Sequence, residues 1–487
     1  FSDAEMNRFS TASLITRSTN DIQQIQMVET MVLRMILYAP IIGIGGIIKV
    51  LSTRSGMEWI IVVAVITLVA VVMVLMGVAM PRFKKMQILV DRINLVAREI
   101  LTGLPVIRAF GREKKEEERF DDANVALTKN MLFTNRVMTF MMPLMMFIMY
   151  GVSILIVWVS TDKINTGTIQ VGTMTAFITY SMQIVMAFLM ITMFSVMLPR
   201  ASVSAERIDE VLNTKVSIED KPDTKANPVA NGEVAFEHVS FAYPGAKENV
   251  LEDISFVAKT GQTTAIIGGT GSGKTTLVNL IPRFFDVTKG KVMVDGTDIR
   301  EMSQESLREA IGYVPQKGVL FSGTIASNLR YGKEDATKEQ VMDAARIAQA
   351  KEIIDGKKDG LDSAIAQGGS NVSGGQKQRF SIARAIVKDP KIYIFDDSFS
   401  ALDYKTDAIL RRELSKKTKE AAVIIVAQRI STILHAEQII VLNEGKVAGI
   451  GTHQELFDHC AVYREIAESQ LSEADIAKLK AQGKEVM

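Results

Sequence analysis

The fold class of this chain is decided by one stretch, Thr264-Ala265-Ile266-Ile267 followed by Gly268-Gly269-Thr270-Gly271-Ser272-Gly273-Lys274-Thr275. A short apolar run of this kind is typical of a buried strand, and a helical pattern follows the glycine-rich segment. The order of strand, G-x-x-x-x-G-K-T loop and helix is that of a phosphate-binding P-loop. The sequence therefore predicts an α/β domain around this loop that binds a nucleoside triphosphate.

Each residue type in the loop has a physical role. Glycines let backbone N–H groups face phosphate oxygens, and the N-terminus of the following helix adds a favourable dipole. We expect Lys274 to contact the β- and γ-phosphates and Thr275 to bind Mg²⁺. The predicted cofactors are ATP and Mg²⁺, and the predicted ATP-binding residues here are Gly268, Gly269, Thr270, Gly271, Ser272, Gly273, Lys274, Thr275 and Thr276.

A second apolar run, Ile392-Tyr393-Ile394-Phe395, ends in Asp396 and Asp397. A parallel strand that is buried on both faces has such a continuous apolar pattern. An acidic side chain at the carboxyl end of this strand reaches the Mg²⁺ shell, which makes Asp396 a predicted metal ligand. This pattern is weak evidence by itself and gains its meaning from the P-loop.

A third motif, Val372-Ser373-Gly374-Gly375-Gln376, precedes a helical pattern over residues 377–388. The serine, the glycine amides and the helix N-terminus would form another phosphate-binding cap. Because one P-loop needs only one such cradle, the second predicts a nucleotide that is held by another chain.

Long apolar runs dominate the first half of the chain. Residues 59–80, 137–161 and 168–199 contain no charged side chain, and each run exceeds the ~20 residues that a membrane span needs. Hydrophobic residues make up 47% of the 487 residues, as expected of a membrane protein. The alternative, buried core helices of a soluble protein, is disfavoured by the presence of three such runs.

Charge indicates the topology of these spans. Lys and Arg are concentrated in residues 81–136, whereas the short connections between the other apolar runs carry one such residue each. The positive-inside rule therefore places 81–136 in the cytosol. The polar residues before the first span and the ATP-binding domain after the last span are both expected in the cytosol, so the number of crossings must be even. This requires a fourth span near residues 31–51, in which Arg34 and Lys49 reach towards the interface.

Composition limits the remaining possibilities. The 56 basic and 55 acidic residues nearly balance, so no electrostatic argument favours nucleic acid as a partner. The single cysteine, Cys460, excludes an intrachain disulfide and a cysteine-based metal site. The sequence opens at Phe1 without a signal-peptide pattern, and we expect a chain that lacks its true N-terminus.

The P-loop, the Ser-Gly-Gly-Gln signature and the strand that ends in Asp396, in this arrangement, resemble the nucleotide-binding domain of ABC (ATP-binding cassette) transporters. The resemblance covers the whole chain. It implies that Tyr243 stacks on adenine, that Gln316 senses Mg²⁺ as a further ligand, and that Asp403 belongs to the D-loop. It also implies that a partner subunit's ATP site is completed by Ser373, Gly374, Gly375 and Gln376.

The apolar half resembles the membrane domain of type IV exporters, formerly called type I, whose subunits have six spans with long cytosolic helical extensions. The implied fold is an α-helical transmembrane domain joined to an α/β P-loop ATPase domain. The predicted parts are a partial transmembrane domain over 1–205, a linker over 206–230, the nucleotide-binding domain over 231–475 and a tail over 476–487. Four spans are visible, near 31–51, 59–80, 137–161 and 168–199, so the first two are expected to be missing.

Two short helices press on the ATP domains in these exporters, and residues 10–16 and 106–111 match them by position. Methionines recur at helical spacing over 138–149 and 182–197. They fit a polyspecific hydrophobic cavity, because methionine is flexible and polarizable. The alternative is that they face lipid or pack between helices in the ordinary way, and we favour this alternative.

Two positions depart from the family pattern beside the γ-phosphate. Asp397 stands at the position where the family has a glutamate that polarises the attacking water. Gln428 stands at the position of the family's switch histidine. The aspartate carboxylate falls ~1 Å short of the same water, and a misplacement of that size costs on the order of 100-fold in rate. Glutamine donates a hydrogen bond but takes up no proton near neutral pH. We therefore expect a catalytic position that binds ATP and hydrolyses it slowly.

This combination resembles the degenerate subunit of heterodimeric bacterial multidrug exporters. The resemblance implies a second half-subunit with a competent site, a multi-pass location in the plasma membrane and a cytosolic ATP domain. It also implies export of hydrophobic or amphipathic compounds such as drugs, lipids or peptides. Two alternatives stay open, namely a homodimeric exporter with two slow sites and an ATP-binding membrane regulator without transport.

Overall fold

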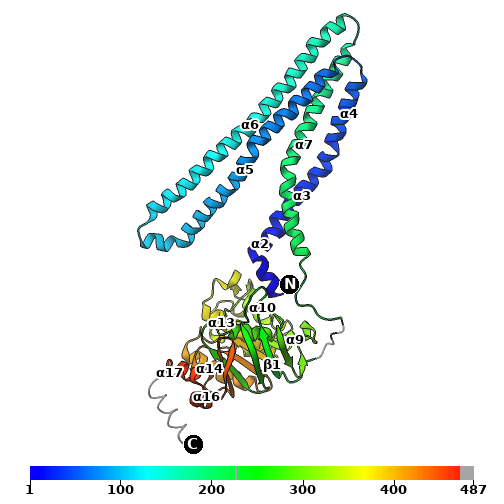
Figure 1. The fold of residues 1–487 in the computed structure, drawn as a ribbon. Coiled ribbons are helices and arrows are strands. Elements are labelled where there is room, and N and C mark those ends of the chain that lie inside the picture. Colours follow the sequence, from blue (N-terminus) through cyan, green and yellow to red (C-terminus); the bar gives the residue numbers. More distant parts are fainter. Residues whose placement is uncertain (223, 225–227, 472–487) are drawn as a thin grey trace. The chain divides into compact units, whose positions relative to one another are not determined.

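The computed structural model describes residues 1–222, 224 and 228–471. The chain divides into two compact units, one made of Thr11–Thr214 and the other of Phe1–Ser10 together with Lys215–Met487 (Figure 1). The first unit is helical and the second contains the described strands. This confirms the predicted combination of a helical membrane domain and an α/β domain.

The helical unit is built from a few long helices. α5 runs beside α6, and α4 runs beside α7 (Figure 1). In chain order the helices are α2 (Thr11–Thr16), α3 (Ile22–Met31), α4 (Tyr38–Ser52), α5 (Glu58–Ala109), α6 (Glu113–Asn165) and α7 (Val171–Leu212), with π-helical turns η1 (Arg17–Asp21) and η2 (Val32–Ile36).

Helix length agrees with a membrane domain that extends into water. α5 has 52 residues and α6 has 53. At ~1.5 Å per residue each is about 78 Å long, more than twice a ~30 Å hydrocarbon core. In the described part of the chain, α5, α6 and Val171–Ile191 of α7 are long and apolar enough to span a membrane, whereas Tyr38–Ser52 is shorter. The fourth span therefore stays a prediction.

Close contacts hold α4 against α7. A Cβ atom at Gly43 would lie 3.2 Å from the Cβ of Ala187, and one at Gly46 would lie 3.1 Å from Cγ1 of Ile184. Small residues that let two helices approach closely are typical of membrane interfaces. The two glycines therefore set the separation between these helices.

The methionines of α6 divide between two environments. Met145 is buried and packs with Leu68 and Val185, whereas Met142 is 55% exposed and Met146 is 50% exposed. Packing between helices accounts for Met145. The exposed pair faces outward from the described helices.

Of the two short helices expected by position, residues 10–16 and 106–111, the structure contains the first, and a further helix precedes it. α1 covers Asp3–Phe9 and begins with a capping box formed by Ser2 and Glu5. Ser10, at φ 52°, separates it from α2, which covers most of the expected residues 10–16. Residues 106–111 form no separate helix, because α5 continues to Ala109 and is followed by a turn.

The predicted linker, 206–230, begins too early. α7 continues to Leu212, because charged residues at helical spacing extend the amphipathic pattern beyond the apolar run. The division between the units falls after Thr214. The predicted transmembrane domain over 1–205 likewise differs, since Phe1–Ser10 belongs to the unit that contains the strands.

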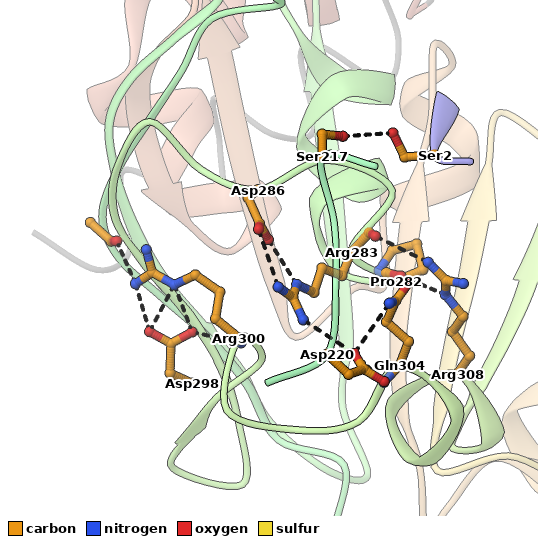
Figure 2. A network of polar contacts seen from close by, with 11 residues as sticks. Ser2, Ser217, Asp220, Pro282, Arg283, Asp286, Asp298, Arg300, Gln304 and Arg308 are labelled. Carbon is orange, nitrogen blue, oxygen red and sulfur yellow. Dashed lines mark hydrogen bonds and ion pairs between the residues drawn. The ribbon is translucent and has the colours of Figure 1, made fainter. Parts of the chain in front are cut away.

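Polar contacts tie the segment after Thr214 to its own unit (Figure 2). Asp220 accepts hydrogen bonds from the backbone N and Nε2 of Gln304 at 3.0 and 3.1 Å. Its carboxylate also lies 3.6 Å from Nη1 of the buried Arg283. The backbone N of Ser217 donates to Oε1 of Glu5 at 3.1 Å, which joins this segment to α1.

Glu5 forms contacts that should depend on pH. Burial raises the pKa of its carboxyl, but hydrogen bonds from Ser2 and Ser217 outweigh burial and lower the pKa from 4.5 to about 2. Because the folded-state pKa is depressed, the stabilisation is present above pH 4.5 and is lost as pH falls towards about 2.

We expect Glu5→Gln to lower the free energy of unfolding by about 2 kcal/mol at pH 7, since hydrogen bonds to a charged group are lost. Thermal unfolding of the purified chain should show this deficit, and the deficit should shrink between pH 4.5 and about 2. Glu248→Gln, at an exposed position, is the control. A deficit that is equal at all pH values would contradict the assignment.

The strands of the second unit form two main sheets. The four-stranded antiparallel sheet has the order β2 (Leu251–Ala258), β1 (Val234–Phe241), β4 (Lys289–Val294), β5 (Thr297–Asp298). The six-stranded sheet has the order β12 (Lys446–Gly451), β11 (Gln438–Asn443), β3 (Thr263–Gly268), β10 (Ala422–Val426), β9 (Ile392–Asp396), β6 (Ile311–Val314). Its strands pair in parallel except at β12, and β7 (Gly323–Thr324) pairs separately with β8 (Ala364–Ile365).

The six-stranded sheet lies between two cores, one built mainly with helices and the other with α8 (Lys274–Leu280) and the four-stranded sheet. On β3, Ala265 and Ile267 enter one core while Ile266 enters the other. The sheet is therefore buried on both faces, as its continuous apolar runs predict. The helices are α8 (Lys274–Leu280), α9 (Gln304–Glu309), α10 (Ile325–Arg330), α11 (Lys338–Ile347), α12 (Lys351–Asp355), α13 (Gly374–Lys388), α14 (Tyr404–Lys417), α15 (Ile430–Ile433), α16 (His453–His459) and α17 (Ala461–Glu468), with 3₁₀ turns η3 (Gly360–Asp362) and η4 (Gln367–Gly369).

Candidate functional site

Four neighbouring parallel strands bring the predicted site residues to one edge of the sheet. The P-loop follows β3, Gln428 follows β10, Asp396 ends β9 and Gln316 follows β6. In open α/β sheets, ligands bind beyond the carboxyl ends of such strands. Residues that are far apart in the sequence thereby line one site.

An open cleft of about 480 Å³ lies at this edge. Its volume is within the range of ligand sites, ~300–1,000 Å³. The lining residues are Val250, Gly268, Gly269, Thr270, Gly271, Gly273, Lys274, Thr275, Thr276, Gln316, Asp396, Asp397, Val426, Gln428, Ile466, Ser469 and Gln470. Most of the predicted ATP-binding and catalytic residues therefore meet in one cleft, whereas Ser272 of the P-loop is buried.

The P-loop has the geometry of a phosphate cradle. No heavy atom lies within 4 Å of a Cβ built at Gly269 or Gly271, so the backbone is accessible there. Lys274 Nζ donates to the carbonyl oxygens of Gly268 and Gly269 at 2.8 and 2.6 Å. Burial lowers the pKa of Lys274, and the nearby Asp397 and Asp396 oppose that effect. The half-buried cation and open amides fit a triphosphate.

Gly273 is required by the turn that leads from the loop into α8. It has φ 94°, in the left-handed region that favours glycine. A Cβ at this position would also lie 2.7 Å from Cδ2 of Leu251. A side chain here would therefore be strained and would clash with β2.

Thr275 and Asp396 place two side-chain oxygen atoms next to each other in the cleft. Thr275 Oγ1 donates to Asp396 Oδ1 at 3.0 Å. Burial raises the pKa of Asp396; the Thr275 hydrogen bond lowers it, and the charge of Asp397 raises it further. Hydroxyl and carboxylate oxygens are the ligands that Mg²⁺ prefers. These residues fit Mg²⁺, which when bound would neutralise phosphate charge.

Asp397 and Gln428, the two residues that depart from the family pattern, form a hydrogen bond with each other. Asp397 Oδ2 accepts a hydrogen bond from Gln428 Nε2 at 2.7 Å and another from Gln316 Nε2 at 3.3 Å. Asp397 is buried and has φ 46°, a conformation that aspartate adopts more readily than most residues. One carboxylate oxygen is therefore shared by two amide groups.

Tyr243 lies beside the P-loop helix. Its hydroxyl is 2.9 Å from Oγ1 of Thr276, and its ring packs edge-on against Phe241 and Phe285. These contacts hold an aromatic ring near the predicted nucleotide site. They agree with its predicted position beside the P-loop.

The signature motif and the predicted D-loop residue do not line this cleft among the described residues. Ser373 caps α13, where its hydroxyl accepts from Gln376 N at 3.3 Å and Gln376 Oε1 accepts from Ser373 N at 3.1 Å. Asp403 caps α14, and hydrogen bonds from Thr406 lower its pKa. Gly374 has open space around its Cβ position. The chain's own P-loop thus lies apart from its signature.

One wall of the cleft is not marked by any sequence motif. Ile466, Ser469 and Gln470 lie at the end of α17 and just after it, and Val250 precedes β2. No local motif marks these residues, because only tertiary packing brings them to the cleft. Among them, Gln470 forms hydrogen bonds with the loop that contains Gln428.

Two family models match the chain. Residues 251–400 match the model described as ABC transporter, and residues 4–188 match the model described as ABC transporter transmembrane region. Together these matches cover parts of both units.

Similar proteins span most of the chain. An uncharacterised ABC transporter ATP-binding protein of Mycobacterium bovis is 44% identical over 481 residues, covering 98% of this chain and 82% of that protein. An ATP-dependent lipid A-core flippase of Desulfotalea psychrophila is 32% identical over 449 residues, covering 92% and 78%. The structure of a bacterial Atm1-family ABC exporter with ATP bound matches with TM-score 0.76 and 27% identity, covering 96% of this chain and 84% of that one.

Proposed function

Because this chain belongs to the ABC transporter family, as an exporter half-subunit, we propose that its own ATP site is degenerate and that it works with a second, competent half-subunit. The family assignment makes it a multi-pass membrane protein with a cytosolic ATPase domain that drives export. The proposal concerns the division of labour between the two ATP sites.

The contact between Asp397 and Gln428 carries this proposal. Asp397 Oδ2 accepts from two amide groups, at 2.7 and 3.3 Å. A carboxylate held in this way, and one methylene shorter than glutamate, is poorly placed to orient an attacking water. Gln428 cannot take up a proton near neutral pH. Slow hydrolysis is the consequence that we propose.

Most of the contacts that we propose for ATP and Mg²⁺ lie outside these two side chains. Lys274 and the open amides of the P-loop would hold the phosphates, and Thr275 with Asp396 would hold Mg²⁺. We therefore propose that the site retains ATP and keeps the two ATP domains associated. The Ser373 cap would complete the partner's competent site, where most hydrolysis takes place.

We propose that the transported compounds are hydrophobic or amphipathic and leave the cell across the plasma membrane. The outward-facing Met142 and Met146 supply polarizable surface in the membrane domain. A relative named as a lipid A-core flippase supports an amphipathic substrate. Uptake of a fluorescent amphiphile into inverted vesicles tests this, and failure across drug, lipid and peptide classes would favour a regulator without transport.

The main experiment measures ATP hydrolysis in lipid by the full chain alone and with a co-expressed exporter half-subunit. We expect the chain alone to be at least about 100-fold slower than the pair, given the cost of misplacing a catalytic group. A chain that hydrolyses ATP at full speed alone would contradict the degenerate site and favour a homodimer with two equal sites.

A further inference from the structure

The C-terminal helix α17 is firmly packed against the ATPase core. Tyr463 and Ala467 are fully buried, and Val462, Ile466 and Leu471 pack against the same core. This packing fixes the end of the helix at the wall of the nucleotide cleft. A side chain just after the helix is therefore held in a defined place.

From this position, the side chain of Gln470 forms hydrogen bonds with the loop after β10. Its Nε2 donates to the carbonyl oxygen of Gln428 at 2.9 Å, and its Oε1 accepts from the backbone N of Ile430 at 2.9 Å. Ile430 begins α15, so its N–H has no partner within that helix. One side-chain amide thus satisfies backbone groups on both sides of Arg429.

A path of direct contacts leads from Gln470 to the hydrolytic residues. The backbone of Gln428 is held by Gln470, and its side chain donates to Asp397 at 2.7 Å. An amide nitrogen carries two hydrogens. With one engaged by Asp397, the other is available to a γ-phosphate in the cleft that both residues line.

We propose that Gln470 is a positioning residue that orients Gln428 for recognition of the γ-phosphate, so that the C-terminal helix sets how well this site distinguishes ATP from ADP. This inference rests on the proposed function in one respect, the role of Gln428 beside the γ-phosphate. ADP lacks that phosphate, so its binding should not depend on the orientation of Gln428.

The test compares the affinity of the full chain in lipid for a non-hydrolysable ATP analogue and for ADP, both with Mg²⁺, by calorimetry. We expect Gln470→Ala to weaken analogue binding about 10-fold, the equivalent of one hydrogen bond to a charged group, and to change ADP binding less than about twofold. Gln470→Asn, with the same amide on a shorter side chain, should give a similar loss because it cannot bridge both backbone groups.

A double-mutant cycle separates positioning from a general structural role. In a Gln428→Ala background, Gln470→Ala should cause no further loss, because its effect acts through Gln428. Gln454→Ala is the matched control, since that glutamine lies on α16 and donates to Asp458 within the same helix. Equal weakening of both nucleotides, an effect that persists without Gln428, or unchanged binding would each overturn the proposal.

This outcome is independent of the hydrolysis test. Fast hydrolysis by the chain alone would contradict the degenerate site. It would not contradict the proposal that Gln470 sets the ratio of ATP affinity to ADP affinity. An unchanged ratio in the Gln470 variants would contradict the positioning role and would leave the slow site standing.

Discussion

Replacing Gly374 with glutamate should reduce ATP hydrolysis by the two-subunit complex by at least about 100-fold, comparable to the loss of a group that stabilises a transition state. The reason is that Gly374 lies at the start of α13, in the cradle that we propose for the partner's γ-phosphate. A carboxylate there would repel the phosphate and block close approach of the backbone.

The same substitution should leave this chain folded. A Cβ at Gly374 meets no heavy atom within 4 Å. A negative charge at the N-terminus of a helix is favourable by about 0.3–1 kcal/mol. Stability and activity should therefore change independently, which thermal unfolding and phosphate release measure on the same sample.

Ser373→Ala provides a second test with a matched control. It removes the side-chain cap of α13, which costs about 1 kcal/mol by itself. Thr337→Ala removes an equivalent cap on α11, where Thr337 pairs with Gln340. Loss of turnover with Ser373→Ala but not with Thr337→Ala would support the shared site. Normal turnover with Gly374→Glu would show that the cap of α13 faces no nucleotide.

Replacing Asp397 with glutamate and Gln428 with histidine together should raise ATP hydrolysis by the chain alone on the order of 100-fold. Glutamate extends the carboxylate by one methylene towards the attacking water. Histidine at the switch position can exchange a proton near neutral pH. The double substitution also removes the 2.7 Å hydrogen bond that Gln428 Nε2 donates to Asp397 Oδ2.

Each single substitution should give a smaller gain. Gln428→His alone leaves the shorter carboxylate in place, and Asp397→Glu alone leaves a side chain at position 428 that exchanges no proton. Glutamate at position 397 must also adopt φ 46°, and a left-handed conformation costs ~1–2 kcal/mol for most side chains. Steady-state phosphate release measures the gain, and Lys274→Ala in the double variant should abolish it, because Lys274 belongs to this chain's P-loop. A double variant as slow as the parent chain would place the cause of slow hydrolysis elsewhere.

Local sequence was sufficient for the elements on which the nucleotide site is built. β3 spans Thr263–Gly268 and β9 spans Ile392–Asp396, both where apolar runs predict them. The motif predicts Ser373 at the start of a helix, and Ser373 caps α13. Strand burial, turns that need glycine and helix caps depend on neighbouring residues, so a single sequence contains that information.

Local sequence was less successful at boundaries and short elements. The sequence pattern predicts a linker from residue 206, whereas α7 continues to Leu212. The separate helix α1 over Asp3–Phe9, which precedes α2, is not among the predicted elements. Its position depends on Glu5, which bonds to Ser217 in a segment more than two hundred residues away. Pattern reasoning has no access to such a partner.

The sequence by itself determined the family, the membrane spans with long helices, the P-loop and the two unusual residues at 397 and 428, because each depends on residue type and spacing along the chain. Only the tertiary structure decided that Asp397 Oδ2 is shared by Gln316 and Gln428, and that Gln470 holds the backbone of that loop. The physical reason is the order of strands in the parallel sheet, which brings the carboxyl ends of β6, β9, β10 and β3 to one edge and packs α17 beside them.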